Sequence, residues 1–324
     1  MTGAKRLAAG VLVLAGWVIV IPLAVVALAR LVAWDARTSL VELNALTPVL
    51  FLPAWPVAVL AGALRRWALV AASAVVVVAH IGLALPEVRA GEAIPAAARS
   101  APHFRVLDAN VYAPNRDTVA FAAEIRRHRP DVLILQEATP TFVADLDATG
   151  ATADLPFRIT VPRDDPFAAV VASRWPVTED DIVASHGRPI LIRATVEVEG
   201  RAVRLFAVHT VAPTGGARVA WIEDLEVLRS AVAAEDRPVL VAGDFNATWG
   251  HRHFRSLLSI GLTDAAAACG KPYQMTWPRD LPVVPPLLRI DHILTTRGLV
   301  VTRIHAGAGT GSDHRPLVAD VSVL

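Results

Sequence analysis

Three long apolar stretches without acidic or basic side chains in the first quarter of the sequence constrain what this chain can fold into. They run from Leu7 to Ala29, from Ala45 to Ala63 and from Trp67 to Pro86, which is 23, 19 and 20 residues. At a rise of about 1.5 Å per residue, a helix of each length would cross roughly 30 Å of hydrocarbon. The sequence therefore predicts a membrane domain in residues 1–86 with three transmembrane helices, rather than three helices buried in a soluble core.

The middle stretch is the least regular of the three. It contains three prolines: Pro48, Pro53 and Pro56. Because proline lacks a backbone N–H and disrupts a helix interior, this stretch could be a kinked span or a re-entrant segment.

Basic residues near the spans indicate the orientation. Lysine and arginine tie at four on each side, but Lys5 and Arg6 precede the first span, and Arg65 and Arg66 lie together in a very short connection. Basic residues of this kind favour the cytoplasmic side. We therefore expect the amino terminus inside and the remainder of the chain outside the cytoplasmic membrane.

Charge divides the chain in the same place. The whole chain is 54% hydrophobic with a mean hydropathy of +0.47. Residues 1–101 hold 8 Lys and Arg against 4 Asp and Glu, and residues 102–324 hold 23 against 26. The second part lacks the excess of basic residues that draws nucleic acid to a protein surface. Cys269 is the single cysteine, so an internal disulfide is excluded.

The texture changes after residue 101. Residues 87–101 are small, polar and proline-bearing, which is typical of a linker. From Phe104 onward, short β-rich runs alternate with helical patterns. This alternation predicts an α/β fold in residues 102–324, in the form of a two-sheet sandwich with helices.

Polar residues gather where the predicted strands end. They are Asn110, Glu137, His209, Asp244, Asn246, Asp291, Asp313 and His314. Strands that deliver carboxylate, amide and imidazole groups to one edge build a cleft. Their oxygen atoms suit Mg²⁺ or Mn²⁺, whereas zinc would favour more histidine or cysteine. The set therefore predicts metal-assisted phosphoryl chemistry.

The spelling and order of these strings resemble one family. VLDANVY, PDVLILQEA, AVHT, VAGDFNA, TWP, RIDHIL and SDHRPL follow one another between residues 103 and 324. They resemble the endonuclease/exonuclease/phosphatase superfamily, which includes deoxyribonuclease I, abasic-site endonucleases, neutral sphingomyelinases and inositol polyphosphate 5-phosphatases. The resemblance implies the deoxyribonuclease I-like sandwich and a phosphoester hydrolase.

The resemblance also implies a metal site. Glu137 would be the principal ligand of Mg²⁺ (or Mn²⁺), with Asn110 beside it and Asp313 at the edge. The sequence departs from the abasic-site endonucleases at Tyr112, where that branch carries an acid. The metal should then depend mainly on Glu137.

Five further residues receive catalytic roles from the resemblance. Asp244 would orient or deprotonate the attacking water, and Asn246 would hold a phosphate oxygen. His209 and His314 would flank the phosphate, and Asp291 would orient the His314 ring. These roles agree with what in-line attack on a phosphoester requires.

Several of these residues also have simpler interpretations. Ser173 and Arg174 match a string frequent in the family and are candidate substrate-binding residues, but they could equally form a structural turn. Asn110 could cap a strand end. Trp277 is better explained by packing than as a substrate platform.

Residues near the RIDHIL string carry further expectations. Asp291 could pair with Arg289 instead of serving catalysis. His292 should point to the opposite face of its strand, so that its replacement leaves activity nearly unchanged. His251 and His253 are expected to be exposed at the start of a helix.

The sequence therefore predicts a membrane-anchored, Mg²⁺-dependent phosphoesterase whose catalytic domain lies outside the cytoplasmic membrane. A narrower resemblance, to actinobacterial membrane proteins associated with teicoplanin resistance, rests on the three spans and on TWP with RIDHIL. Lipid-linked or cell-envelope phosphoesters are the favoured substrates. The alternatives are an extracellular nuclease, with nucleic acid as partner, and a non-catalytic binding module. No protein partner is inferred.

Overall fold

The computed structural model describes residues 3–88, 91, 93–281 and 283–324. The chain forms two compact units. The first comprises Met1–Glu87 with Trp249–Arg252, and the second comprises Val88–Thr248 with His253–Leu324. The predicted linker, residues 87–101, lies partly outside the described residues at positions 89, 90 and 92, and its last third forms the short helix α6 (Ala96–Ser100).

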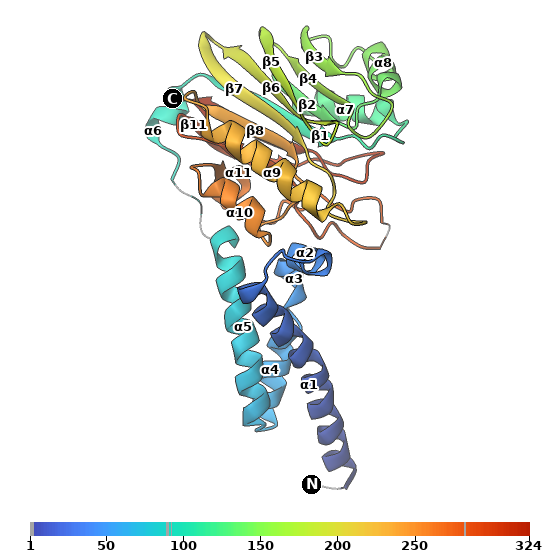
Figure 1. Cartoon of the computed structure of the whole chain (residues 1–324), viewed down its shortest axis with the longest axis vertical. Coiled ribbons are helices and arrows are strands. Elements are labelled where there is room, and N and C mark those ends of the chain that lie inside the picture. Colours follow the sequence, from blue (N-terminus) through green and yellow to red (C-terminus); the bar gives the residue numbers. More distant parts are fainter. Residues whose placement is uncertain (1–2, 89–90, 92, 282) are drawn as a thin grey trace. The chain divides into compact units, whose positions relative to one another are not determined.

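Two described helices of the first unit are long and apolar enough to cross a membrane (Figure 1). They are α1 (Gly3–Val32) and α5 (Trp67–Val88). The middle predicted span, Ala45–Ala63, is broken into α3 (Thr47–Leu50) and α4 (Ala54–Ala63), and α2 (Thr38–Ala45) precedes it with a bend of 72°. The described residues therefore hold two candidate spans, or three if the bent pair forms one.

The first unit contains buried polar groups as well as apolar ones. The Asn44 side chain donates to Asp35 Oδ1 at 2.8 Å, and both residues are buried. His251 is also buried, with Nε2 at 2.9 Å from the carbonyl oxygen of Val41. The expectation that His251 is exposed is therefore wrong, because this backbone contact takes its ring out of solvent. His253 is half-buried.

Two mixed six-stranded sheets form the second unit, as the sequence predicts. The first has the order β11-β12-β1-β2-β4-β3, and the second has the order β5-β6-β7-β8-β10-β9. The strands of the first sheet are β1 (His103–Asn110), β2 (Val132–Gln136), β3 (Phe157–Val161), β4 (Ala169–Ser173), β11 (Leu299–Ala306) and β12 (Leu317–Val323). Those of the second are β5 (Val177–Ser185), β6 (Arg188–Val198), β7 (Arg201–His209), β8 (Val239–Asp244), β9 (Thr263–Asp264) and β10 (Asp291–Thr295).

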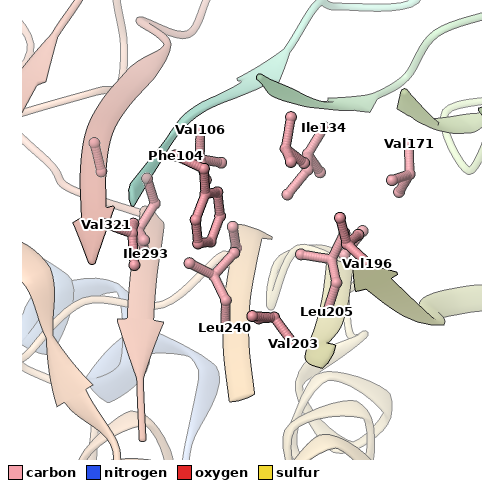
Figure 2. Packing of buried hydrophobic residues seen from close by; sticks show 14 of the residues in the cluster. Phe104, Val106, Ile134, Val171, Val196, Val203, Leu205, Leu240, Ile293 and Val321 are labelled. Carbon is pink, nitrogen blue, oxygen red and sulfur yellow. The ribbon is translucent and has the colours of Figure 1, made fainter. Parts of the chain in front are cut away.

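The core lies between the two sheets. Figure 2 shows side chains of both sheets pointing toward one another, among them Val106 and Ile134 from the first sheet and Leu205 and Leu240 from the second. Every second residue of these strands belongs to the core, as the period of a strand requires. Burial of apolar surface contributes about 25 cal/mol per Å², so this layer is the main source of stability for the sandwich.

Helices cover the outer faces of the sandwich (Figure 1). They are α7 (Thr118–His128), α8 (Pro140–Ala148), α9 (Arg218–Ala233) and α10 (Arg252–Leu258), whereas α11 (Ala265–Ala268) contributes Ala265 and Ala266 to the core between the sheets. Phe121 of α7 and Phe142 of α8 pack on Leu107 and Leu133 of the first sheet. α9 contacts β5, and α11 contacts β10 and β11. The α/β sandwich predicted from the sequence is confirmed.

Candidate active site

The predicted catalytic and metal-site residues lie at one end of the sandwich, within the second unit. Asn110, His209 and Asp244 each continue the inward-facing alternation of their strand, and Asp291 begins such a series in β10. β7 and β8 run parallel and place His209 opposite Asp244, while antiparallel β10 places Asp291 opposite Asp244. The residues that line the core deeper in the strands are therefore replaced by polar groups at this end.

Sharp reversals follow three of these strands. Tyr112, Glu137 and Asn246 have φ values of +64°, +60° and +47°, in the left-handed region that residues with a Cβ adopt infrequently. In β8, an added Cβ at Gly243 would lie 1.9 Å from the carbonyl oxygen of Val208, so only glycine permits the close approach of β7. Such conformations persist where the surrounding structure enforces them, often at functional sites.

Asp244 is the centre of the site. Its Oδ2 accepts a hydrogen bond from Asn110 Nδ2 at 3.1 Å and lies 3.8 Å from Nε2 of both His209 and His314. Its Oδ1 accepts from the backbone N–H of Asn246 at 2.8 Å. Asp244 is almost fully buried, and this burial, together with the charge of Asp291, raises its pKa to about 7. A carboxyl with this pKa can accept a proton near neutral pH.

Glu137 lies beside Asp244 across the two sheets. Its Oε1 accepts from Asn110 Nδ2 at 3.0 Å and lies 4.0 Å from His209 Nε2, and its Oε2 accepts from the backbone N–H of Ala113 at 2.9 Å. Asn110 therefore bridges two carboxylates, while its own Oδ1 accepts from the Tyr112 N–H at 3.0 Å. These contacts fix the direction of both Glu137 oxygens.

His314 and Asp291 form a buried pair. His314 Nδ1 lies 2.9 Å from Asp291 Oδ2, which leaves Nε2 directed toward Asp244. Burial opposes the charged ring, but the carboxylates of Asp291 and Asp244 outweigh burial and raise the pKa of His314 to about 10. The ring is therefore an imidazolium at neutral pH. The alternative interpretation, in which Asp291 pairs with Arg289, does not fit, because Arg289 Nη1 contacts Asp264 Oδ2 at 2.7 Å.

The second histidine has the opposite electrostatic environment. Burial lowers the pKa of His209, so its ring is neutral at pH 7. The ring stacks on Phe167 with centroids 5.2 Å apart, and the Arg188 guanidinium lies 5.4 Å from the Phe167 ring centroid. The site therefore presents one neutral and one charged imidazole on the same carboxylate.

Asn246 is held by its backbone and by its side chain. Its Nδ2 donates to the carbonyl oxygen of Thr210 at 2.9 Å. The carbonyl oxygen of Phe245 accepts from Thr210 Oγ1 at 2.6 Å and from Trp221 Nε1 at 3.1 Å. The sequence does not indicate this role of Thr210 or Trp221, since a string such as VHT shows nothing of what its threonine contacts.

Asp313 lies at the margin of the site. Trp277 Nε1 donates to Asp313 Oδ2 at 3.2 Å, and the Ser312 hydroxyl donates to the carbonyl oxygen of Asn110 at 2.8 Å. Burial raises the pKa of Asp313, and its Oδ1 is a buried oxygen without a hydrogen-bond partner among the described residues. The Trp277 side chain therefore orients an acid at the margin of the site.

The donor set fits a hard divalent cation. Asp244, Asp291 and His314 bring ligand atoms within 4.8 Å of one another, and Glu137 and Asp313 add carboxylate oxygens nearby. Four carboxyl groups against one imidazolium leave an excess of negative charge that a divalent cation would offset. Protonated His314 cannot act as a ligand, so the carboxylates are the better donors.

Ser173 and Arg174 do not reach this site. β4 runs antiparallel to β2 and pairs Ser173 with Val132, at the end of β2 opposite Glu137. The four residue steps of β2 separate the two ends by roughly 13 Å. The Ser173 hydroxyl accepts from the Trp175 N–H at 3.1 Å, and Arg174 pairs with Asp131 at 2.8 Å. The prediction that they bind substrate at this site is therefore wrong, and the alternative of a structural turn fits.

The model of the endonuclease/exonuclease/phosphatase family matches residues 109–314, which is more than half of the chain and contains every residue of the site. The chain belongs to this family. Its members use divalent metals, in agreement with the donor set above. A search of curated proteins finds no match.

Solved structures agree on the fold. An endonuclease/exonuclease/phosphatase family protein from Bacteroides thetaiotaomicron is 17% identical, with a TM-score of 0.56 over 69% of this chain and 99% of that one. TDP2 from D. rerio, complexed with a single-strand DNA product, is 16% identical, with a TM-score of 0.57 over 68% and 99%. A family protein from Beutenbergia cavernae is 20% identical, with a TM-score of 0.50 over 68% and 72%. The shared part is the sandwich.

Proposed function

We propose that this chain is a membrane-anchored, divalent-metal-dependent phosphoesterase, with Mg²⁺ or Mn²⁺ as the metal and its catalytic unit outside the cytoplasmic membrane. The observation that carries the chemistry is the environment of the Asp244 carboxylate. Its Oδ2 accepts a hydrogen bond from Asn110 and lies 3.8 Å from Nε2 of both His209 and His314. A carboxyl with a pKa near 7 beside a neutral and a charged imidazole is an acid–base set for hydrolysis.

In this proposal Asp244 accepts a proton from the attacking water, because its pKa lets it serve as a base near neutral pH. Asn110 orients the carboxylate through its 3.1 Å hydrogen bond. Asn246 directs its remaining side-chain N–H and its Oδ1 toward the substrate, since Thr210 engages only one donor. These groups fix the water and one phosphate oxygen before reaction.

His314 supplies positive charge to the phosphate as the bond to the leaving oxygen breaks. Asp291 holds the ring through Nδ1, so Nε2 carries a proton that it can donate. His209 flanks the phosphate from the other side as a neutral donor. Electrostatic stabilisation of this kind usually makes the largest single contribution to catalysis.

Glu137 would hold the metal, with Asn110 and Asp313 at its edge. The bound cation would neutralise charge on the nonbridging phosphate oxygens. Both Glu137 oxygens are already directed by hydrogen bonds, which favours one geometry for a ligand.

For the substrate, we propose a lipid-linked or cell-envelope phosphoester. Two helices could hold the chain at a membrane. In addition, the segment that joins Trp277 to Asp291 exposes apolar side chains, with Leu281 47% and Val283 89% exposed. Exposed apolar side chains on the unit that carries the site suit a substrate with a hydrocarbon part. The resemblance to membrane proteins associated with teicoplanin resistance agrees with this class and stays a prediction.

An extracellular nuclease is the second candidate. The D. rerio TDP2 structure with a single-strand DNA product supports nucleic acid as an alternative substrate for this fold. The balance of 23 basic against 26 acidic residues in 102–324 disfavours strong nucleic-acid binding. The non-catalytic alternative is disfavoured by the full acid–base set.

The test is a hydrolysis screen of the full-length protein in detergent with Mg²⁺ or Mn²⁺ against polyprenyl phosphates and pyrophosphates, sphingomyelin, inositol phosphates and plasmid DNA. Metal-dependent turnover of a lipid-linked phosphate supports the proposal, and turnover of DNA alone supports the nuclease. No metal-dependent turnover of any of them contradicts the enzyme.

The orientation has its own test. An Arg99→Cys variant, in a Cys269→Ser background, should react with a membrane-impermeant maleimide on intact cells. Labelling only after permeabilisation would place the catalytic unit inside and contradict the extracytoplasmic proposal.

A further inference from the structure

His292 lies directly behind the site. It follows Asp291 in β10 and faces the other side of the sheet, as the strand period predicts. It is fully buried, and its ring lies against Phe254, with centroids 4.1 Å apart, and edge-on to Phe245 at 5.4 Å. Although His292 faces away from the site, both nitrogens of its ring have polar partners.

The protonation of the ring follows from these partners. Nε2 lies 2.8 Å from the carbonyl oxygen of Ala247, and a carbonyl can only accept, so Nε2 carries a proton and donates. Nδ1 lies 2.8 Å from Arg289 Nη1, which can only donate, and 3.0 Å from Asp264 Oδ2, which can only accept. Asp264 Oδ2 also accepts from the same Arg289 nitrogen at 2.7 Å. Of the two ring nitrogens, Nε2 is therefore the one whose partner requires a proton.

The bond from His292 acts on the turn that carries Asn246. The left-handed φ of +47° at Asn246 is flanked by two carbonyl groups, those of Phe245 and Ala247. Thr210 and Trp221 hold the first, and His292 holds the second. The turn is thus held on both sides, and His292 is the partner on the side away from the substrate.

We propose that His292 is a positioning residue for Asn246: through Nε2–H and the Ala247 carbonyl it holds the turn that aims the Asn246 carboxamide at the phosphate. The inference rests on the proposed function of Asn246. It revises the sequence-based expectation that replacing His292 is nearly silent. A displacement of about 1 Å in a catalytic group can lower a rate by about 100-fold, so we expect the loss of this bond to lower kcat by about 10- to 100-fold.

Three variants of the full-length protein in detergent separate this role from general packing. His292→Phe keeps the ring volume and removes the donor, and His292→Gln keeps a side-chain N–H that can reach Ala247. Leu294→Ala is the matched control, because Leu294 is fully buried on the same face of β10. With bis(4-nitrophenyl) phosphate and Mg²⁺, His292→Phe should lower kcat with little change in KM, His292→Gln should restore most of it, and Leu294→Ala should lower only the melting temperature. Equal kcat losses in the Phe and Ala variants would overturn the inference.

A double-mutant cycle with Asn246→Ala tests the route of the effect. If His292 acts through Asn246, the 10- to 100-fold loss from His292→Phe should vanish in the Asn246→Ala background. Full additivity would overturn the inference while leaving the proposed function in place. A fully active Asn246→Ala variant would instead contradict the role of Asn246 in the proposed function.

Hydrogen exchange gives a readout that needs no substrate. Backbone amides of residues 245–249 should exchange faster in His292→Phe than in the wild type, and His292→Gln and Leu294→Ala should resemble the wild type there. Unchanged exchange would overturn the inference whatever the activity. If His292→Phe does not fold, the ¹⁵N shifts of His292 in the wild type decide, because a ring without a proton on Nε2 at pH 7 would overturn the inference.

Discussion

The two ends of the sandwich differ in whether their acidic side chains are paired with arginine. At the end where β1 and β2 begin, each acid has an arginine: Arg105 makes a two-pronged contact with Asp320, at 2.6 and 3.2 Å, and Arg174 pairs with Asp131. At the end where β1 and β2 finish, Glu137 and Asp244 contact imidazoles and an amide, and among the described residues no arginine pairs with either carboxylate. Acids paired with arginine (the matched end) are neutralised by the protein itself, whereas buried acids without such a partner (the unmatched end) require a cation or a proton.

The strands of the sandwich run from one of these ends to the other (Figure 1). Parallel β1 and β2 deliver their last residues to the same edge, and so do parallel β7 and β8. With Asp291 at the start of antiparallel β10, the unmatched end therefore collects contributions from five strands. The opposite end collects strand beginnings and the exposed Arg174, and we expect it to contribute to stability alone.

The largest effect should come from the unmatched end. Replacing Glu137 with alanine should lower hydrolysis of a small phosphodiester by about 10³- to 10⁴-fold, because the metal supplies several kcal/mol of charge stabilisation. Unfolding should be unaffected or shifted to higher temperature, because one of several crowded acids is removed. The rate is measured by steady-state kinetics, metal binding by calorimetric titration with Mn²⁺, and stability by thermal melts. Activity that survives at saturating Mg²⁺ would contradict the metal assignment.

The acid–base set should give the next largest effect. Asp244→Asn and His314→Ala should each lower kcat by about 10²- to 10³-fold with little change in KM, because their contacts strengthen in the transition state. The control is Glu235→Ala, since Glu235 is a buried acid that already pairs with Arg204. It should cost stability and leave kcat unchanged. Raised KM with normal kcat in the Asp244 or His314 variant would argue for a binding role instead.

The pH profile sharpens the same contrast. Asp244 must be ionised to accept a proton, so kcat/KM should fall about tenfold per unit as pH drops below about 7. His314 must be protonated, so the rate should fall again above about 10. A bound cation stabilises the ionised carboxylate, and higher Mg²⁺ should therefore move the acid limb to lower pH. An acid limb that persists in Asp244→Asn would assign it to another group.

The smallest effect should come from the matched end. Arg174→Ala removes an ion pair whose arginine side chain is 57% exposed, and such pairs contribute at most about 1 kcal/mol. The free energy of unfolding in urea should drop by that amount or less, and kcat and KM should stay unchanged. A loss of activity would indicate that Arg174 binds substrate and would contradict the distinction between the two ends.

The sequence by itself determined which residues stand at strand ends. Asn110, His209 and Asp244 follow alternating apolar runs, and the period of two residues fixes the face on which each lies once the run is recognised. The two long apolar helices are equally predictable from the sequence, because each comes from a long uncharged apolar run. The strand alternation and the long apolar runs are local properties of the chain, and the fold class follows from the order in which strands and helices occur.

Tertiary structure decided the contacts that join distant parts of the chain. The string around Ser173 gave no sign that antiparallel β4 carries it to the wrong end of β2. The alternation in β10 predicted that His292 faces away from Asp291, but not that its ring meets the Ala247 carbonyl 45 residues earlier in the chain. Such contacts depend on how the sheet is ordered and how deeply each side chain is buried. A local pattern records the face of a residue, whereas its partner is set only when the whole sandwich closes.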